Sequence, residues 1–195
     1  LFIGVNAASN VSLALNADGT FNYSPDANYN GTVTFTYQAC DPSNVCDQAI
    51  VTITVVPVND APVANDDNGG TLTEDGANGT VSILTNDTDA DGAPTVPTNG
   101  VGQFTIDLDA GTAGPQTSLT IATGTWSYNT ATGVVTFDPA NDYNGTATLT
   151  YTLCDPSAAC DPAVITFTVN GTLSDFPGNN YWVADTMAVF GTTQC

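Results

Sequence analysis

Three aspartates at alternate positions near residue 90 are the first side chains whose types and spacing suit chemistry. Residues 87–92 are Asp-Thr-Asp-Ala-Asp-Gly, and the glycine permits a sharp turn after the last carboxylate. This spacing is typical of loops that bind Ca²⁺ through oxygen ligands, although the distal glutamate of an EF-hand is missing. We predict a calcium site at Asp87, Asp89 and Asp91; the alternative is a solvated acidic turn.

A second group of oxygen-bearing side chains lies in residues 56–67, VPVNDAPVANDD. Prolines interrupt this acidic stretch, so it predicts a connector between two domains. An ion bound there would neutralise the carboxylates and stiffen the junction. The predicted ligands are Asn59, Asp60, Asp66 and Asp67.

The charge of the chain excludes most other chemistry. Its 195 residues include 20 Asp and Glu but no Lys, Arg or His, for a net charge of −20. A phosphate backbone would be repelled, so we predict no nucleic-acid partner. Histidine bases, Schiff-base lysines and arginine clamps are absent, and the carboxylates are scattered rather than paired across a cleft. We therefore predict no enzymatic activity.

Apolar runs stay shorter than about 18 residues, so we also predict no membrane insertion.

Four of the five cysteines form two matched pairs, Cys40 with Cys46 and Cys154 with Cys160, and Cys195 is left over. Each pair closes a short Cys-Asp-Pro-Ser-x-x-Cys loop, which predicts two local disulfides and an oxidising, extracellular setting. Paired metal ligands are the alternative, which the absence of histidine disfavours.

Both pairs belong to a sequence that occurs twice. Residues 25–55 and 139–169 match at a constant offset of 114 without a gap, so the chain contains an internal repeat. A further half-repeat, residues 61–114, precedes the second copy and has no counterpart ahead of the first.

The elements that must position these groups are strands. Residues 32–39 alternate strictly, so we expect Val33, Phe35, Tyr37 and Ala39 to face inward. No segment shows a sustained helical period. Further strands are expected over residues 1–5, 11–15, 20–23, 51–55, 81–84, 104–108, 118–122, 125–128, 134–137, 147–153 and 164–169, and near Thr71.

These patterns predict an all-β chain of two tandem immunoglobulin-like antiparallel β-sandwiches, the first incomplete within one chain. We expect the incomplete domain at residues 1–58 and the complete one at residues 59–169. Residues 170–195 are then a tail that packs on the second domain or on a neighbour.

Several motifs together resemble a known family. They are Asn-Ala-Asp-Gly-Thr-Phe at 16–21, Pro-Asp-Ala-Asn-Tyr-Asn-Gly-Thr at 25–32, Val-Asn-Asp-Ala-Pro-Val-Ala at 58–64 and Asn-Asp-Thr-Asp-Ala-Asp-Gly at 86–92. In this order they are similar to the tandem bacterial cadherin-like, immunoglobulin-like repeats of large secreted and cell-surface proteins. The resemblance covers roughly residues 1–169 and implies calcium association. The family's repeat opens with the half that the first copy lacks.

Asn-x-Ser/Thr sequons are frequent, and sugar can be attached at such sites in a secreted protein. For Asn30 and Asn144 the alternative is a tight Asn-Gly turn. The candidate sites are Asn10, Asn30, Asn78, Asn86, Asn144 and Asn170.

A sandwich without its opening strands exposes strand edges and would recruit a strand. We predict the subunit of an extracellular, pilus-like fibril, in which donor-strand exchange with another copy completes the first domain. The expected donor is residues 1–8, through Leu1, Phe2, Ile3 and Val5, and the second candidate is residues 181–190. The alternative is a calcium-stabilised spacer from a large secreted or surface adhesin. Surface glycans are expected as a further partner.

Overall fold

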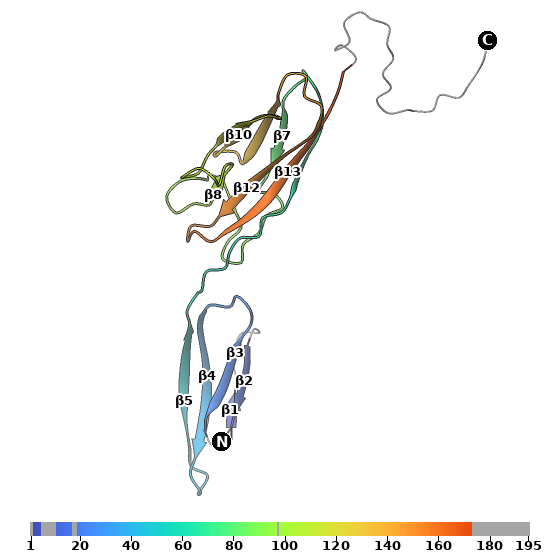
Figure 1. Ribbon diagram of the computed structural model, residues 1–195. Coiled ribbons are helices and arrows are strands. Elements are labelled where there is room, and N and C mark those ends of the chain that lie inside the picture. Colours follow the sequence, from blue (N-terminus) through green and yellow to red (C-terminus); the bar gives the residue numbers. More distant parts are fainter. Residues whose placement is uncertain (1, 5–10, 17–18, 97, 173–195) are drawn as a thin grey trace, which may run out of the picture.

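The computed structural model describes residues 2–4, 11–16, 19–96 and 98–172, and all regular elements in these ranges are strands (Figure 1). The predicted all-β class is confirmed. Within these ranges no helix is long and apolar enough to cross a membrane. The strands fall into module 1 (residues 2–55) and module 2 (residues 67–170). Outside the described residues lie Leu1, Val5, Asn10, residues 181–190 and Cys195.

Module 2 contains two four-stranded sheets (Figure 1). Apolar side chains alternate along their strands, so one face of each sheet is buried. One sheet has the order β7 (Gly79–Ser82), β11 (Val134–Pro139), β10 (Gly124–Asn129) and β9 (Ser118–Ile121). The other has the order β6 (Asp67–Thr73), β13 (Cys160–Asn170), β12 (Gly145–Cys154) and β8 (Thr105–Asp107).

Three fully buried aromatic rings join the two sheets of module 2. Trp126 and Phe137 come from one sheet and stack with ring centroids 4.1 Å apart. Phe167 comes from the other sheet and lies 5.4 Å from Phe137 and 5.8 Å from Trp126. Large buried rings dominate the apolar area of a small core, so these contacts hold the sandwich together.

The pairing of β6 differs from the predicted antiparallel arrangement, because β6 runs parallel to β13. Strand β6 lies alongside β13 in one sheet. The chain then crosses to the other sheet, where β7 pairs antiparallel with β11. The β6–β13 pair joins the two ends of the domain, and the apolar alternation within a strand carries no information about the direction of so distant a partner.

The described part of module 1 contains five strands in two small sheets. One sheet has the order β1 (Phe2–Gly4), β4 (Gly31–Cys40) and β5 (Cys46–Val55). The other pairs β2 (Val11–Leu15) with β3 (Phe21–Pro25).

The β4–β5 hairpin has the same register as the β12–β13 hairpin, residue for residue at the repeat offset. Strand β1 takes the place of β8, since Phe2 lies opposite Gln38 on β4 as Asp107 lies opposite Thr152 on β12. Within residues 2–55, the described strands include no counterpart of β6, β7 or β9. The edges of β5 and β3 that β6 and β7 would cover are therefore open.

Candidate functional site

In module 2, β6 is the edge strand next to β13 in one sheet, and β7 is the edge strand next to β11 in the other. They pack closely on Phe167, since a Cβ atom on Gly69 would lie 2.1 Å from its ring and one on Gly79 would lie 2.4 Å from it. Both positions therefore need glycine while Phe167 is present. This closure leaves the inward side chains of β13 almost without solvent contact.

A buried tyrosine ties the same segment to the sandwich. The hydroxyl of Tyr151 on β12 donates to Asp67 Oδ2 at 3.1 Å or to Asp87 Oδ2 at 3.4 Å. Burial raises the pKa of Asp67 to about 6; the hydrogen bond from Tyr151 opposes this shift and the charge of Asp87 adds to it. Burial also raises the pKa of Asp87 and that of Tyr151. The cluster is structural, because its hydroxyl stays protonated and faces the core.

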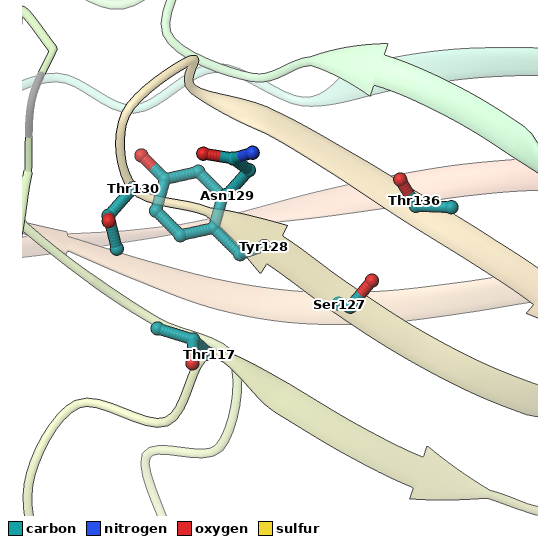
Figure 2. A pocket seen from close by; sticks show the side chains of 6 residues that line it. All are labelled: Thr117, Ser127, Tyr128, Asn129, Thr130 and Thr136. Atoms are coloured by element: carbon teal, nitrogen blue, oxygen red, sulfur yellow. The ribbon is translucent and has the colours of Figure 1, made fainter.

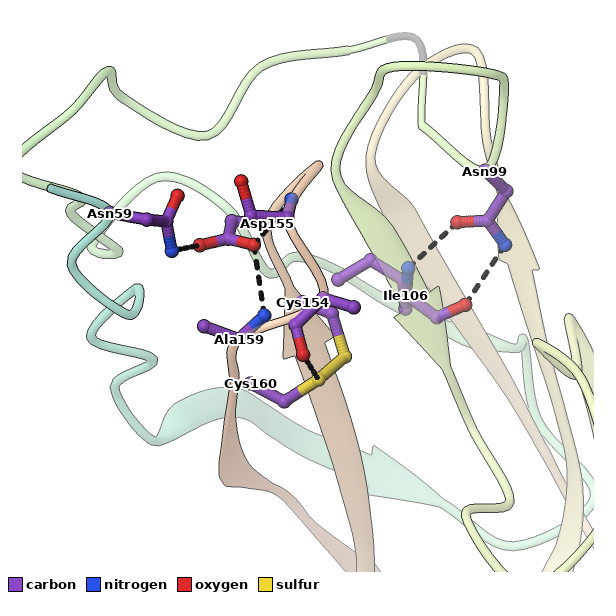
Figure 3. Close-up of a disulfide and its surroundings, with 9 residues drawn as sticks. Asn59, Asn99, Ile106, Cys154, Asp155, Ala159 and Cys160 are labelled. Carbon is purple, nitrogen blue, oxygen red and sulfur yellow. Dashed lines mark hydrogen bonds between the residues drawn. A yellow bond between two sulfur atoms is a disulfide. The ribbon is translucent and has the colours of Figure 1, made fainter. Parts of the chain in front are cut away.

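Two aspartates of the β12–β13 hairpin hold the connector, and Figure 3 shows the first of them, Asp155, beside Asn59. Asp155 Oδ2 accepts a hydrogen bond from the side-chain amide of Asn59 at 2.6 Å. Asp161 Oδ2 accepts one from the backbone amide of Ala64 at 3.0 Å. Burial alone would raise the pKa of Asp155, but the hydrogen bonds from Asn59 and from the backbone of its own turn outweigh burial and lower that pKa. Asp155 is therefore a carboxylate anchor for the connector.

The predicted disulfides Cys40–Cys46 and Cys154–Cys160 are both present. Each closes a turn in which one aspartate organises the backbone. Asp41 Oδ1 accepts from the amides of Ser43 at 2.8 Å and Val45 at 2.9 Å. In the second turn the corresponding distances from Asp155 Oδ1 are 2.8 and 3.0 Å. The repeated Cys-Asp-Pro-Ser sequence thus encodes one rigid turn twice.

The same hairpin is far more exposed in module 1. Only Val33 and Phe35 are buried among the described hydrophobic residues there, at 8% and 3% exposure. Tyr37 is half-buried and Ala39 is exposed, so the predicted inward face is correct for two of its four positions. On β5, Val51, Ile53 and Val55 are half-buried and Ala49 is exposed, whereas their counterparts on β13 are at most 2% exposed: Ala163, Ile165, Phe167 and Val169.

The β3 edge of module 1 is open in the same way. Phe21 is 39% exposed, while its counterpart Val135 on β11 is fully buried. Phe21 keeps one aromatic contact, edge-on to Phe35 at 5.1 Å. An unpaired strand edge with half-exposed apolar side chains is a surface that binds another strand. We therefore take the edge formed by β5 and β3 as the candidate functional site, an interaction edge.

The expected donor residues lie elsewhere. Phe2 and Ile3 belong to β1, which pairs with β4 of its own chain. Leu1 and Val5 are outside the described residues. Strand donation by residues 1–8 stays a prediction.

The predicted metal ligands are distributed over three places. Asp67 and Asp87 face Tyr151, and Asp66 Oδ1 accepts from the amide of Val164 at 2.9 Å. Among the residues that the structure describes, no three acidic or cysteine side chains are grouped to hold a metal ion. The calcium site stays a prediction, and its remaining candidates lie near the connector: Asn59, Asp60, Asp89 and Asp91.

Two clefts flank these remaining candidates. One of about 270 Å³ is lined by residues that include Asp26, Asp60 and Asp91. The other, of about 180 Å³, is lined by Asp89 and Asp155 among others. The carboxylates nearby already bind backbone amides: Asp91 Oδ2 accepts from Asp60 at 2.7 Å, and Asp89 Oδ1 accepts from Asp91 at 2.7 Å. Oxygen donors of this kind suit calcium, but they do not converge on one point.

A polar groove of about 440 Å³ lies over β10 and β11 (Figure 2). Its hydroxyl and amide side chains include Tyr128, whose hydroxyl lies 2.8 Å from Thr98 Oγ1. Burial raises the pKa of Tyr128, so the groove offers hydrogen-bonding groups but no acid or base near neutral pH. Its lining residues are Thr117, Ser127, Tyr128, Asn129, Thr130 and Thr136.

The described sequons differ in how free their amides are. Asn86 donates to the carbonyl of Asp66 at 3.1 Å, and Asn144 donates to Glu74 at 3.4 Å. All five described asparagines are nevertheless exposed: Asn30, Asn78, Asn86, Asn144 and Asn170. Exposure suits glycosylation, which stays a prediction at all six positions.

Sequence reasoning missed the polar anchors Tyr151, Asp155 and Asp161. Each recurs in the first copy, as Tyr37, Asp41 and Asp47. Recurrence of a polar residue at an inward or turn position was the available signal. This recurrence could not show which residue each of the three side chains binds.

The folds, the acidic connector and the paired disulfide turns define a class: tandem immunoglobulin-like modules of extracellular, adhesin-like repeat regions. The chain belongs to the bacterial cadherin-like domain family, whose family model matches residues 59–171, more than half of the chain. Residues 1–54 match the family model of a bacterial Ig domain. The resemblance predicted from the sequence is confirmed. None of the curated protein sequences compared with the chain matches it.

Solved structures agree on the fold. Protocadherin gamma C5 EC1-3 aligns with a TM-score of 0.52 at 17% identity, over 87% of this chain and 56% of that one. Protocadherin gamma B7 extracellular cadherin domains 1-4 align with a TM-score of 0.50 at 17% identity, over 88% and 42%. An endo-fucoidan hydrolase of glycoside hydrolase family 107 reaches only 0.39 at 15% identity, over 92% and 25%, which supports no statement about activity. The chain thus spans about a quarter to a half of these structures.

The two family matches and the disulfides indicate an extracellular or surface protein. Domains of these families are typically non-enzymatic. Cadherin-like domains commonly bind calcium.

Proposed function

We propose that this chain is the structural subunit of an extracellular, pilus-like fibril in which a strand from a neighbouring copy completes module 1. The observation that carries the proposal is the open sandwich of module 1, whose inward β5 side chains are exposed or half-buried where those of β13 are buried. Open sheet edges bind strands through main-chain hydrogen bonds and side-chain pockets. The partners are copies of the chain itself, and no step of the assembly is enzymatic.

The donor in this proposal is the N-terminal segment, residues 1–8. Among the described residues, strand β1 pairs with β4 from Phe2 to Gly4. In the proposal, residues 1–8 leave β4 and add to the open β5 edge of a neighbouring copy. A head-to-tail exchange of this kind does not close into a dimer, so it propagates into a fibre.

Negative-stain electron microscopy of the purified chain, with and without EDTA, tests this function. We expect long regular fibres in both conditions. Deletion of residues 1–8 should abolish them, whereas Val101→Asp, at a fully exposed position of module 2, should leave them unchanged. A monodisperse monomer from the unaltered chain would sink the fibril proposal.

The acidic clefts beside the connector favour a second candidate, a calcium-stabilised spacer in an adhesin. Isothermal titration with Ca²⁺ tests it, since binding should be lost in an Asp60→Asn, Asp91→Asn double variant. For the fibril subunit and for the spacer alike, the polar groove of Figure 2 is the candidate binding site for a surface glycan.

A further inference from the structure

Module 2 shows in detail how an opening segment is held on this fold. Residues 59–87, here called the opening segment, pair with β13 and β11 and also bind three polar groups of the β12–β13 hairpin. Those groups are Asp155, Asp161 and Tyr151. Their partners, in the same order, are the side chain of Asn59, the amide of Ala64 and the carboxylates of Asp67 and Asp87.

Module 1 presents the same three groups at the same repeat positions: Asp41, Asp47 and Tyr37. Asp41 uses Oδ1 to organise its turn, as Asp155 does. Asp47 accepts from the neighbouring amide of Gln48 at 2.8 Å. Among the described residues, nothing reaches Asp41 Oδ2 or the Tyr37 hydroxyl from the far side of β5, where the opening segment lies in module 2. The three groups therefore form an anchor set with no opening segment bound.

The apolar surface of this edge has the matching shape. Val51 and Val55 are half-buried where their counterparts on β13 are covered by β6. Ile53 stands where Phe167 fills the space against Gly69 and Gly79. Because isoleucine is smaller than phenylalanine, the edge of module 1 has room for a segment with small side chains, and not only glycine, at those two positions.

From this correspondence we infer that the β5 and β3 edge of module 1 binds an opening segment of the same pattern as residues 59–87, supplied from outside residues 1–195. The segment brings an asparagine to Asp41, a backbone amide to Asp47 and, eight residues after the asparagine, a carboxylate to Tyr37. It runs parallel to β5 and then antiparallel to β3. Residues 1–8 contain no acidic side chain, so they lack the carboxylate that this ligand brings to Tyr37, and the inference does not depend on fibre formation.

A labelled synthetic peptide with the sequence of residues 59–87, titrated into the complete chain, tests the inference by fluorescence anisotropy and hydrogen exchange. We expect saturable binding and new amide protection over residues 46–55, with none over 160–170. Tyr37→Phe should weaken binding about ten-fold, because it removes a hydrogen bond to a charged group. The matched variant Tyr151→Phe, in the occupied module, should leave peptide affinity unchanged.

A peptide that lacks both carboxylates, through Asp67→Ala and Asp87→Ala, should also bind about ten-fold more weakly, and its effect should not add to that of Tyr37→Phe. Absence of protection over residues 46–55, or binding insensitive to Tyr37→Phe, would overturn the inference. Fibres without peptide binding would leave the fibril proposal standing alone. Peptide binding by a chain that never forms fibres would support the inference and contradict the fibril proposal.

Discussion

Two strands of closely similar sequence, β5 and β13, occupy different environments in this molecule. β5 and β13 share their alternation, their disulfide and their hairpin register, yet Ile165 is fully buried and its counterpart Val51 is half-exposed. The difference lies in β6 and β7, which cover only module 2. Alternation therefore specifies which face of a strand can be buried, and a separate segment decides whether it is.

The largest expected effect separates the two modules directly. Phe167→Ala should lower the free energy of unfolding of module 2 by about 4 kcal/mol, because it empties the centre of a closed core. The matched Ile53→Ala should cost module 1 less than about 1 kcal/mol, because that side chain is already half in water. Urea denaturation followed by residue-resolved hydrogen exchange measures both. Equal losses would show that module 1 is closed in solution.

A second substitution tests the close packing that β13 has and β5 lacks. Gly69→Ala should destabilise module 2 by about 3 kcal/mol, since its Cβ atom would overlap the Phe167 ring. Phe167→Ile, which installs the residue of module 1, should recover part of that loss in the double variant. Strict additivity of the two changes in thermal unfolding would contradict the proposed contact.

The buried carboxylate of module 2 should give it a pH dependence. The pKa of Asp67 is about 6 in the folded state, above its value of about 3.9 in an unfolded chain. The folded state therefore binds the proton more tightly, so this contribution to stability is complete below about pH 4 and is lost as the pH rises through about 6. Module 2 should melt at a higher temperature at pH 5 than at pH 7, and Asp67→Asn should reduce the difference.

The matched control for that experiment is Asp47→Asn on exposed β5. It removes the same charge from a chain of net charge −20, so it corrects for general repulsion. An equal reduction in both variants would assign the pH dependence to net charge rather than to the Tyr151 cluster.

The smallest expected effect concerns the disulfide turns. Ala158 has φ 66°, in the left-handed region, where its counterpart Asn44 has φ 62°. Asparagine tolerates this conformation better than alanine does, so Ala158→Asn should stabilise module 2 by about 0.5 kcal/mol. The reverse change, Asn44→Ala, should destabilise module 1 by a similar amount. Differential scanning calorimetry resolves both shifts, and a loss of stability in Ala158→Asn would count against this reason.

Local sequence was sufficient for much of this structure. The alternation of residues 32–39 located β4, and the matched Cys-Asp-Pro-Ser motifs located both disulfide turns. Long-range features were beyond it: the parallel direction of β6, the exposure of Ala39, and the contact of Tyr151 with Asp67, 84 residues away. Each depends on which distant segment lies alongside, and periodicity does not encode that.

The parallel pairing of β6 with β13 has a mechanical consequence. These are the first and last strands of module 2, so tension applied through its two ends pulls them past each other along their length. The hydrogen bonds of a parallel ladder loaded in this direction resist together instead of opening one after another. A surface tether built from such modules would bear load through this clamp, and a module 1 left without its opening strands would be the first to give way.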